Sequence, residues 1–395
     1  MTELNINNDK VLLVANVPSM IDMFNRDNIS ILLNMGYKLC VACNFNNASN
    51  YSADRTEKLK HDLDELGVEH IDLPVPRSVT KVFDLIPAIN ILKNWLKNNP
   101  CKLIHCQSPF GGVVARLAAK PFRKNGTKVL YYAHGFHFFK GASIINWALY
   151  YNMEKYLAKY TDVIVTINKE DYNTAKCKLK ADKVTYIPGV GINTKRISGV
   201  VADKEKKCAE LGISSDKKII LKVAELAKGK NIEAAIEIFS KIKYTDSVLV
   251  VCGKGKLLNE LKAAAKKFNV ADRVFLLGYR TDIFEFCKIS DLFLFTSKRE
   301  GLPVAVMEAM AAGLPVVCSD IRGNSDLIEN DKGGYIVKLP NIEEFAAKTD
   351  IILADESKRK AMGEYNMSLA SGKLDISNIG KMMKDLYTTM LESGL

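Results

Sequence analysis

The 395-residue sequence contains no uninterrupted apolar stretch of the roughly 18–20 residues that a membrane-spanning helix needs. Its first residues, Met1–Ile6, also lack the basic start and the apolar run of a secretory signal. We therefore expect a cytoplasmic protein. The composition is that of a folded chain, with 48% hydrophobic residues, 26% charged residues and a mean hydropathy of −0.03.

Cysteine and histidine are too scattered to indicate a disulfide framework or a metal centre. The nine cysteines are odd in number and spread along the chain, a pattern that favours reduced thiols. Cys40 and Cys43 have the C-x-x-C spacing of redox and zinc sites, but no second pair follows, and the apolar run 37–43 predicts a buried strand. The five histidines form no H-x-x-x-H pair and have no cluster of acids beside them, so we expect neither a metal ion nor another cofactor.

Acidic residues are missing from residues 101–150, which contain seven basic ones. The asymmetry extends over the first half, because residues 1–200 carry a net charge of +9 and residues 201–395 a net charge of +2. Such a surface attracts nucleic acid, anionic lipid headgroups or a phosphorylated substrate, although a merely soluble basic face explains it equally well. No nucleic-acid motif with interleaved aromatics is present, so we expect no nucleic acid partner.

Both halves of the chain repeat a pattern of short β-branched runs and longer amphipathic stretches, which is typical of parallel sheets with crossover helices. The length also suggests two domains. The polar segment 196–210 has no strand pattern and is interpreted as a linker. We therefore predict an N-terminal domain at 1–195, a C-terminal domain at 211–375 and a C-terminal helix at 376–395.

The expected strands are 10–15, 37–43, 70–73, 103–106, 128–133, 163–166 and 184–187 in the first half, and 218–223, 247–251, 273–277, 292–296, 315–319 and 334–337 in the second. Each half is thus expected to be a doubly wound, Rossmann-like α/β domain. Domains of this class bind ligands at the carboxyl ends of their strands. We expect the two domains to face each other across a ligand-binding cleft, with the C-terminal helix packing back on the first.

The segment 297–317, with the sequence SKREGLPVAVMEAMAAGLPVV, carries the most specific pattern in the chain. Pro303 suits the first turn of a helix, and Gly313 suits its end. The helix would begin at the carboxyl end of a strand, where free N–H groups and the helix dipole bind phosphate. Glu300 and Glu308 could then accept hydrogen bonds from hydroxyls of a ligand. The alternative is a capping acid and a solvated helix carboxylate.

This stretch resembles the Glu-x7-Glu motif of the family-4 retaining glycosyltransferases, which have the GT-B fold. The similarity covers nearly the whole chain and includes the segments 104–109, 186–192 and 277–280. It is strongest to members that build bacterial capsule, exopolysaccharide or related surface glycans.

The resemblance implies roles for the residues of the motif. The family's first glutamate contacts hydroxyls of the donor sugar, and its second glutamate binds the ribose of the nucleotide. These roles fall on Glu300 and Glu308. The resemblance also places the donor diphosphate against backbone amides at Leu302 to Val304, so that the donor-binding backbone comprises Gly301, Leu302, Pro303 and Val304.

The turn 222–231, with the sequence KVAELAKGKN, is the second donor motif. The family usually has an arginine at the strand end and a lysine five residues later, which together neutralise the leaving diphosphate. Lys230 matches the lysine. Glu225 stands at the arginine position, as in some polysaccharide-pathway relatives, so one of the two usual cations is missing. Lys228 is a candidate for the second charge, and a solvated basic turn is the alternative for both lysines.

Three further positions complete the site implied by the resemblance. His134 follows the expected strand 128–133 and would lie beside the donor sugar, whereas we interpret His137 as structural. Gly253 belongs to a glycine turn on the donor side, although a lone G-x-G is weak evidence. Arg280 lies in the loop that borders the nucleobase in relatives.

The first loop, 16–22, lacks the Gly-Gly that many family members have there, so the acceptor cannot be identified from the resemblance. Aromatic and basic residues gather at 136–140 and 147–151. We interpret them either as a surface that docks peripherally on the inner face of the cell membrane, near a lipid-linked acceptor, or as part of the aromatic core.

The resemblance implies a retaining, metal-independent sugar transfer in bacterial polysaccharide biosynthesis. The donor would be a nucleotide diphosphate sugar, with a UDP-hexose or UDP-N-acetylhexosamine expected, and the acceptor a glycan or a polyprenyl-diphosphate-linked sugar. Lys230, Glu300 and His134 are the catalytic candidates. The expected route is front-face attack, in which the departing diphosphate takes the acceptor's proton.

Two other functions are compatible with the sequence. A non-catalytic GT-B scaffold that binds a sugar nucleotide is favoured only by the missing arginine at position 225. A GT-B epimerase acting on UDP-N-acetylglucosamine needs an acid–base set, and only Glu300 and His134 are candidates for it.

Overall fold

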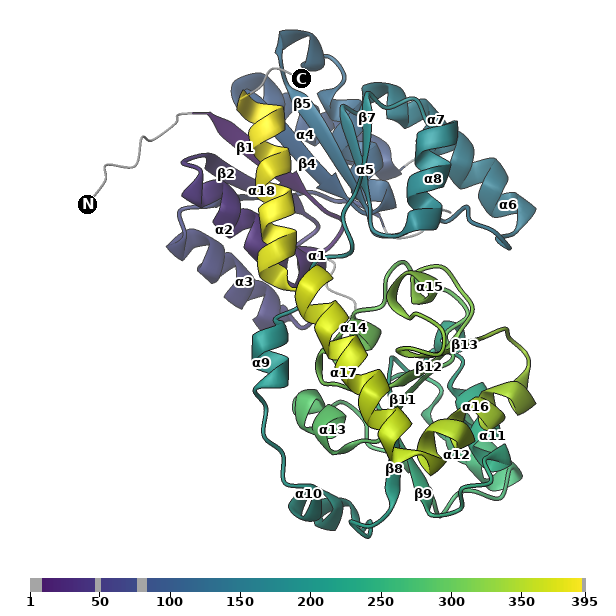
Figure 1. Cartoon of the computed structure of the whole chain (residues 1–395). Coiled ribbons are helices and arrows are strands. Elements are labelled where there is room, and N and C mark those ends of the chain that lie inside the picture. Colours follow the sequence, from purple (N-terminus) through teal and green to yellow (C-terminus); the bar gives the residue numbers. More distant parts are fainter. Residues whose placement is uncertain (1–8, 47–50, 77–83, 393–395) are drawn as a thin grey trace. The chain divides into compact units, whose positions relative to one another are not determined.

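The computed structural model describes residues 9–46, 51–76 and 84–392, which form two compact units (Figure 1). The first unit comprises the residues up to 190 together with those from 379 onward, and the second comprises residues 191–378. Each unit contains one parallel β-sheet with helices packed against it, as the alternation in the sequence predicts. The chain start discussed above, Met1–Ile6, lies outside the described residues.

The sheet of the first unit has seven strands in the order β3-β2-β1-β4-β5-β6-β7. All seven were predicted from the sequence, and their ends lie within two residues of the expected positions. The strand β1 is buried on both faces over most of its length, which explains its continuous apolar sequence. The strands are β1 (Lys10–Val14), β2 (Lys38–Cys43), β3 (Glu69–Asp72), β4 (Cys101–Gln107), β5 (Lys128–Ala133), β6 (Val163–Thr166) and β7 (Lys183–Tyr186).

Helices of this unit pack their apolar residues onto the sheet, as Leu92 and Val114 illustrate. A π-helical segment, Trp147–Tyr151, joins two of the shorter helices. The helices are α1 (Pro18–Phe24), α2 (Arg26–Asn34), α3 (Ala53–Glu65), α4 (Leu85–Asn98), α5 (Pro109–Ala119), α6 (Ile144–Asn146), α7 (Asn152–Leu157) and α8 (Lys169–Lys178).

The sheet of the second unit has six strands in the order β10-β9-β8-β11-β12-β13, and all six were predicted. The strands are β8 (Lys218–Val223), β9 (Ser247–Cys252), β10 (Val274–Leu276), β11 (Leu292–Phe295), β12 (Val316–Ser319) and β13 (Gly334–Val337). The helices are α9 (Thr194–Ser198), α10 (Lys204–Leu211), α11 (Ile232–Lys241), α12 (Leu258–Lys267), α13 (Ile283–Ile289), α14 (Val304–Ala311), α15 (Asn324–Leu327), α16 (Ile342–Ala354) and α17 (Glu356–Lys373).

Both sheets contain a point at which the strand order reverses. In the first sheet the chain builds outward from β1 through β2 and β3, and then resumes on the other side with β4. In the second sheet β8, β9 and β10 run one way, and β11 starts the other side. Loops that follow the two central strands diverge at such a point, which opens a crevice where doubly wound sheets bind ligands.

The segment interpreted as a linker, 196–210, is largely helical. It contains most of α9 and α10, and the boundary between the units lies at 190/191 and not at 195. Both helices are short and polar, so they show little apolar periodicity. Their capping residues Asn193 and Asp203 each accept a hydrogen bond from a backbone N–H of the first turn, which is the sequence signal that marks them.

The last helix, α18 (Ile376–Glu392), runs out of the second unit, and its residues from Ile379 belong to the first. This confirms the expectation that the C-terminal helix returns to the first domain. The side chain of Tyr387 is fully buried there. Among the described residues, no helix combines the length and apolar character needed to cross a membrane.

Candidate active site

The reversal point of the second sheet carries two of the predicted catalytic residues. Lys230 ends the 3-10 turn after β8, and Glu300 lies in the loop after β11. The Lys230 Nζ is 2.7 Å from the Glu300 Oε1. The side chains are 32% and 12% exposed, so a ligand in this crevice can reach both. Residues that are 70 positions apart in the sequence are therefore brought together by the fold, and their catalytic roles stay a prediction.

Backbone and side-chain hydrogen bonds hold the two loops together beneath this ion pair. The Lys298 N–H donates to the carbonyl of Gly229 at 2.9 Å. The Thr296 hydroxyl donates to the carbonyl of Asn231 at 2.7 Å, just beyond Lys230. The positions of Lys230 and Glu300 are thus coupled through the backbone on which each is carried.

A second lysine, which was not identified from the sequence, is buried beside this site. Lys222 is fully buried at the end of β8, and its Nζ donates to the Thr296 hydroxyl at 2.9 Å. Burial lowers the pKa of the Lys222 ammonium to about 7, and the nearby Glu300 carboxylate opposes that shift. A lysine inside the apolar strand KIILKV was the available sequence signal.

The helix α14 begins one residue later than predicted, because Pro303 is its N-cap and Val304 its first helical residue. Among the described residues, no hydrogen-bond acceptor faces the backbone N–H of Val304 or Ala305, as expected for the open N-terminus of a helix. The helix ends at Ala311, and Gly313, just after its C-cap Ala312, has a φ of +87°, the left-handed conformation that favours glycine. This geometry suits an anion placed beside Glu300.

The loop after β12 fixes the backbone in front of α14. A Cβ at Gly323 would lie 2.4 Å from the carbonyl oxygen of Gly301 and 3.2 Å from the Cα of Leu302. The buried Arg322 donates from its Nε to the Glu300 carbonyl at 3.1 Å. These contacts hold the turn from Glu300 to Leu302 in place before any ligand binds. Sequence reasoning did not identify Arg322.

Glu308 lies more than one turn into α14, and its carboxyl group has no hydrogen-bond partner among the described residues. Burial raises the pKa of this carboxyl to about 7. A carboxylate that is costly to ionise and lacks a partner is suited to accept hydrogen bonds from a bound ligand.

The glycine turn after β9 serves the packing of neighbouring loops. A Cβ on Gly253 would lie 1.8 Å from the Ala224 carbonyl oxygen, and one on Gly255 would lie 2.4 Å from that of Leu226. The Leu226 N–H also donates to the carbonyl of Lys254 at 3.0 Å. Gly253 therefore positions the turn that leads to Lys230; direct contact of Gly253 with the donor stays a prediction.

The remaining donor-site candidates have different surroundings. The Arg280 Nε donates to Asp282 at 2.8 Å, and Lys207 of α10 is 2.8 Å from the same carboxylate. These two cations hold the pKa of the Asp282 carboxyl well below its usual range. Glu225 and Lys228 are exposed, and within the described ranges neither has an ion-pair partner. Their contact with a donor stays a prediction.

The first unit presents His134 just beyond β5, beside the reversal point between β1 and β4. Its Nε2 lies 2.7 Å from the Gln107 Oε1, and its ring contacts those of Phe24 and Tyr132, with centroids 5.4 and 5.0 Å away. Burial lowers the pKa of His134 to about 4, so the imidazole is neutral near pH 7. His137 stacks on Tyr150, which agrees with a structural role.

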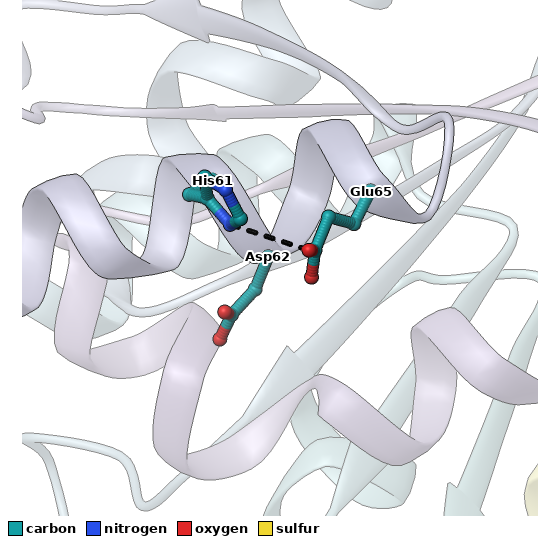
Figure 2. Close-up of side chains that lie close together, drawn as sticks. All are labelled: His61, Asp62 and Glu65. Carbon is teal, nitrogen blue, oxygen red and sulfur yellow. Dashed lines mark ion pairs between the residues drawn. The ribbon is translucent and has the colours of Figure 1, made fainter.

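One group of potential metal-binding side chains occurs among the described residues, on α3 (Figure 2). No acids clustered with histidine were expected from the sequence, but His61, Asp62 and Glu65 share one face there. The His61 Nδ1 is 3.7 Å from the Glu65 carboxylate. Asp62 is already held by Arg26 at 2.7 Å and by Lys58 at 3.3 Å. The cluster thus forms part of a solvent-facing ion-pair network.

Both halves of the chain match models of known protein families. Residues 32–196 match "Glycosyltransferase Family 4", and residues 203–368 match "Glycosyl transferases group 1". EpsD of Bacillus subtilis (strain 168), a protein assigned as a glycosyltransferase, is 33% identical over 328 residues, which cover 82% of this chain and 86% of EpsD. This chain belongs to the family-4 glycosyltransferases.

Other relatives of this glycosyltransferase agree with the assignment. The "UDP-Gal:alpha-D-GlcNAc-diphosphoundecaprenol alpha-1,3-galactosyltransferase" of Escherichia coli is 29% identical, covering 80% of this chain and 82% of that enzyme. The crystal structure of HepE from Anabaena in complex with UDP superposes with a TM-score of 0.77 at 17% identity, covering 96% of this chain and all of HepE. The fold of the glycosyltransferase is therefore GT-B, as expected.

Proposed function

We propose that this glycosyltransferase moves a hexose or N-acetylhexosamine from a UDP-sugar to a glycan or a polyprenyl-diphosphate-linked sugar, in bacterial polysaccharide biosynthesis. The observation that carries the proposal is the Lys230–Glu300 ion pair beside the open N-terminus of α14. A cation and free N–H groups suit a diphosphate, and the carboxylates of Glu300 and Glu308 suit hydroxyls on either side of it. The acceptor class follows the name of the galactosyltransferase relative.

We propose that the transfer retains the anomeric configuration and uses no metal ion. When the donor binds, the Lys230 ammonium would break its ion pair with Glu300 and pair with the diphosphate instead. The Glu300 carboxylate would then accept hydrogen bonds from sugar hydroxyls. The bond between C1 and the phosphate oxygen breaks while the acceptor oxygen bonds to C1 from the same face. The acceptor's proton passes to the departing diphosphate. The residues of the chain therefore act by positioning and by stabilising the leaving group's charge.

The test of this proposal is a thermal-shift panel of nucleotide diphosphate sugars, followed by transfer with each sugar that stabilises the protein. Binding to the native state raises the melting temperature, so the panel identifies the donor. Transfer to a polyprenyl-diphosphate-linked acceptor, with the product linkage read by NMR, tests the reaction and its stereochemistry. An inverted linkage would refute retention, and strict dependence on added magnesium would refute metal independence.

A non-catalytic scaffold is the second candidate, because the exposed Glu225 brings no cation to the diphosphate. The same panel separates the two functions. A scaffold would be stabilised by the sugar nucleotide but would neither transfer nor hydrolyse its sugar.

The affinity for the donor should depend on pH through Glu308. If its carboxylate accepts hydrogen bonds from ribose hydroxyls, only the ionised form binds well. Because its pKa lies at about 7, affinity should be nearly constant above pH 8 and should fall about tenfold per unit well below pH 7. Calorimetry with UDP-glucose measures this, since its diphosphate has no ionisation near neutral pH, unlike free UDP.

The matched variant is Glu308→Gln, which keeps the shape of the side chain but cannot ionise. We expect this variant to bind the donor more weakly. Its affinity should also lose the dependence on pH that Glu308 produces between pH 6 and pH 8. A slope that persists unchanged in this variant would assign the titration to another group.

We also propose that the enzyme meets its lipid-linked acceptor at an anionic membrane surface. The aromatic residues considered for this role point inward, because Phe136 and Phe138 are buried, and Trp147, Tyr150 and Tyr151 pack against the core. The outward face of the same helical segment instead carries Ile144, Ile145 and Leu149, which are 87%, 75% and 45% exposed. Figure 1 shows α6 at an edge of its unit.

Basic residues flank this apolar face. Of the seven in 101–150, four pair with carboxylates from outside the segment: Lys102, Arg116, Arg123 and Lys128. The exposed Lys140 precedes this segment in the sequence, and the exposed Lys155 and Lys159 follow it, on α7 and on the turn after α7. Inserted aliphatic groups with lysines at headgroup level are typical of peripheral membrane contacts.

Replacing both isoleucines by serine, I144S with I145S, should weaken binding to phosphatidylglycerol vesicles at least tenfold in a sedimentation assay. Burying one such side chain contributes about 1.5–3 kcal/mol, so the pair supplies most of the apolar term. The matched control is Ile351→Ser, an isoleucine of the second unit that is 41% exposed. Equal loss in both proteins, or binding that is indifferent to lipid charge, would contradict the assignment. Self-association that the double variant abolishes would mark the face as a protein contact.

A further inference from the structure

A buried chain of hydrogen bonds connects His134 with the C-terminal helix. The His134 Nε2 meets the Gln107 Oε1 at 2.7 Å, and the Gln107 Nε2 lies 3.2 Å from the His105 Nε2. The His105 Nδ1 is in turn 2.8 Å from the Tyr387 hydroxyl. Gln107, His105 and Tyr387 are buried. The proposed reaction gives none of these three residues a role.

The direction of every bond in this series of hydrogen bonds follows from one backbone carbonyl group. The Asn25 Nδ2 donates to the carbonyl of Met20 at 2.8 Å, which fixes the orientation of that amide. Its Oδ1 therefore faces the Gln107 amide and must accept from the Gln107 Nε2. The Asn28 Nδ2 donates to the same Oδ1 at 3.1 Å, which supports this orientation.

The orientation of Gln107 then fixes both imidazoles. Its Oε1 can only accept, so His134 must carry its proton on Nε2. The second N–H of the Gln107 Nε2 points to the His105 Nε2, so the His105 Nε2 must accept this hydrogen bond. His105 carries its proton on Nδ1 and donates to Tyr387. If His105 were charged, its Nε2–H would face an N–H of the Gln107 amide, and two donors would oppose each other in a buried site. His105 is therefore neutral.

We propose that Gln107 is a positioning residue that locks His134 as the Nε2–H tautomer, so that its Nδ1 lone pair accepts a hydrogen bond from a sugar hydroxyl. The orientation of Gln107 is set by Asn25 and supported by the contact of His105 with Tyr387 on α18. This rests on the proposed function, in which His134 lies beside the donor sugar. His134 then acts as a neutral acceptor, and not as an acid or a cation.

The rings on both sides of His134 support this role. Phe24 and Tyr132 contact the imidazole, and neither they nor the neutral amide of Gln107 bring a negative charge to it. Desolvation agrees with this, since it holds the pKa of His134 at about 4. A sugar hydroxyl that donates to Nδ1 would be held in one orientation, which fixes the sugar against rotation in the site.

The first test is the tautomeric state in the full-length protein, labelled with 15N at histidine and observed by long-range 1H–15N NMR. We expect opposite tautomers at the two histidines, with His134 protonated at Nε2 and His105 at Nδ1. In Gln107→Met, His134 should populate both tautomers, and kcat/KM should fall about tenfold. An Nδ1–H tautomer at His134 in the native protein would overturn the proposal, as would a tautomer unchanged in Gln107→Met.

The second test compares two replacements of His134. An asparagine Oδ1 can occupy the place of Nδ1, whereas a glutamine reaches only the place of Nε2. We expect His134→Asn to keep a kcat/KM about tenfold higher than that of His134→Gln, and the reverse order would refute the acceptor role. His137→Asn and His137→Gln are the matched controls and should differ little. The NMR measurement needs no activity, so failure of the proposed transfer reaction is distinguishable from failure of this inference.

Discussion

Replacing Lys230 by alanine is expected to lower kcat by a factor of about 100 to 1000, while the dissociation constant of the donor changes far less. In the free protein the ammonium is already paired with Glu300 at 2.7 Å, so donor binding exchanges one anionic partner for another. The breaking of the bond to C1 leaves additional negative charge on the departing diphosphate. Only at that stage does Lys230 gain an interaction that was absent before.

Steady-state kinetics and calorimetry together measure the two effects of Lys230→Ala. The control is Lys262→Ala on α12, whose side chain is exposed and has no ion-pair partner among the described residues. We expect it to change kcat less than about threefold, as for most solvated lysines. Equal losses of kcat and donor affinity in Lys230→Ala would show that the lysine binds ground state and transition state alike.

The strands and the main donor motifs could be predicted because their signals are local. Most strands of a doubly wound sheet are continuous apolar runs, and all thirteen strands of the two sheets were predicted from the sequence. The carboxyl ends of these strands then place Lys230 and Glu300 at one edge of one sheet. The ion pair between them is the geometric consequence of that topology.

The sequence of one helix, α17, shows little of the usual apolar periodicity. The helix α17 contains Gly363, which weakens a helical prediction. In the fold this glycine lets α17 approach the end of α14, since a Cβ there would lie 2.1 Å from the Gly313 carbonyl oxygen. A residue that is unfavourable for the isolated helix is thus required by its packing.

Contacts between distant parts of the chain could not be predicted. Nothing near His105 in the sequence indicates that Tyr387 reaches it, and the roles of Gln107 and Arg322 depend on loops that meet only in the fold. The buried Lys222, whose Nζ donates to the Thr296 hydroxyl at 2.9 Å, was likewise not identified from the sequence.

This buried charge should be costly, so Lys222→Met should stabilise the protein near pH 7. The folded-state pKa of about 7 lies below the ordinary lysine value of 10.5. Between these two values the unfolded chain binds a proton that the native protein has lost, and stability therefore rises with pH. The cost is fully present below pH 7 and disappears as the pH approaches 10.5. Its size is on the order of 4 kcal/mol, of which the lost hydrogen bond to Thr296 offsets about 1 kcal/mol.

Thermal unfolding of native protein and Lys222→Met from pH 6 to pH 10 checks this. The variant should melt several degrees higher at pH 7, and the difference should shrink steadily as the pH rises. The control is Lys228→Met, which should show no such trend, because an exposed lysine is not desolvated on folding. Lower stability of Lys222→Met at pH 7 would mean that the contact with Thr296 outweighs desolvation. If the stabilised variant also loses turnover, Lys222 contributes to activity through Lys230 and Glu300 while it lowers the stability of the protein.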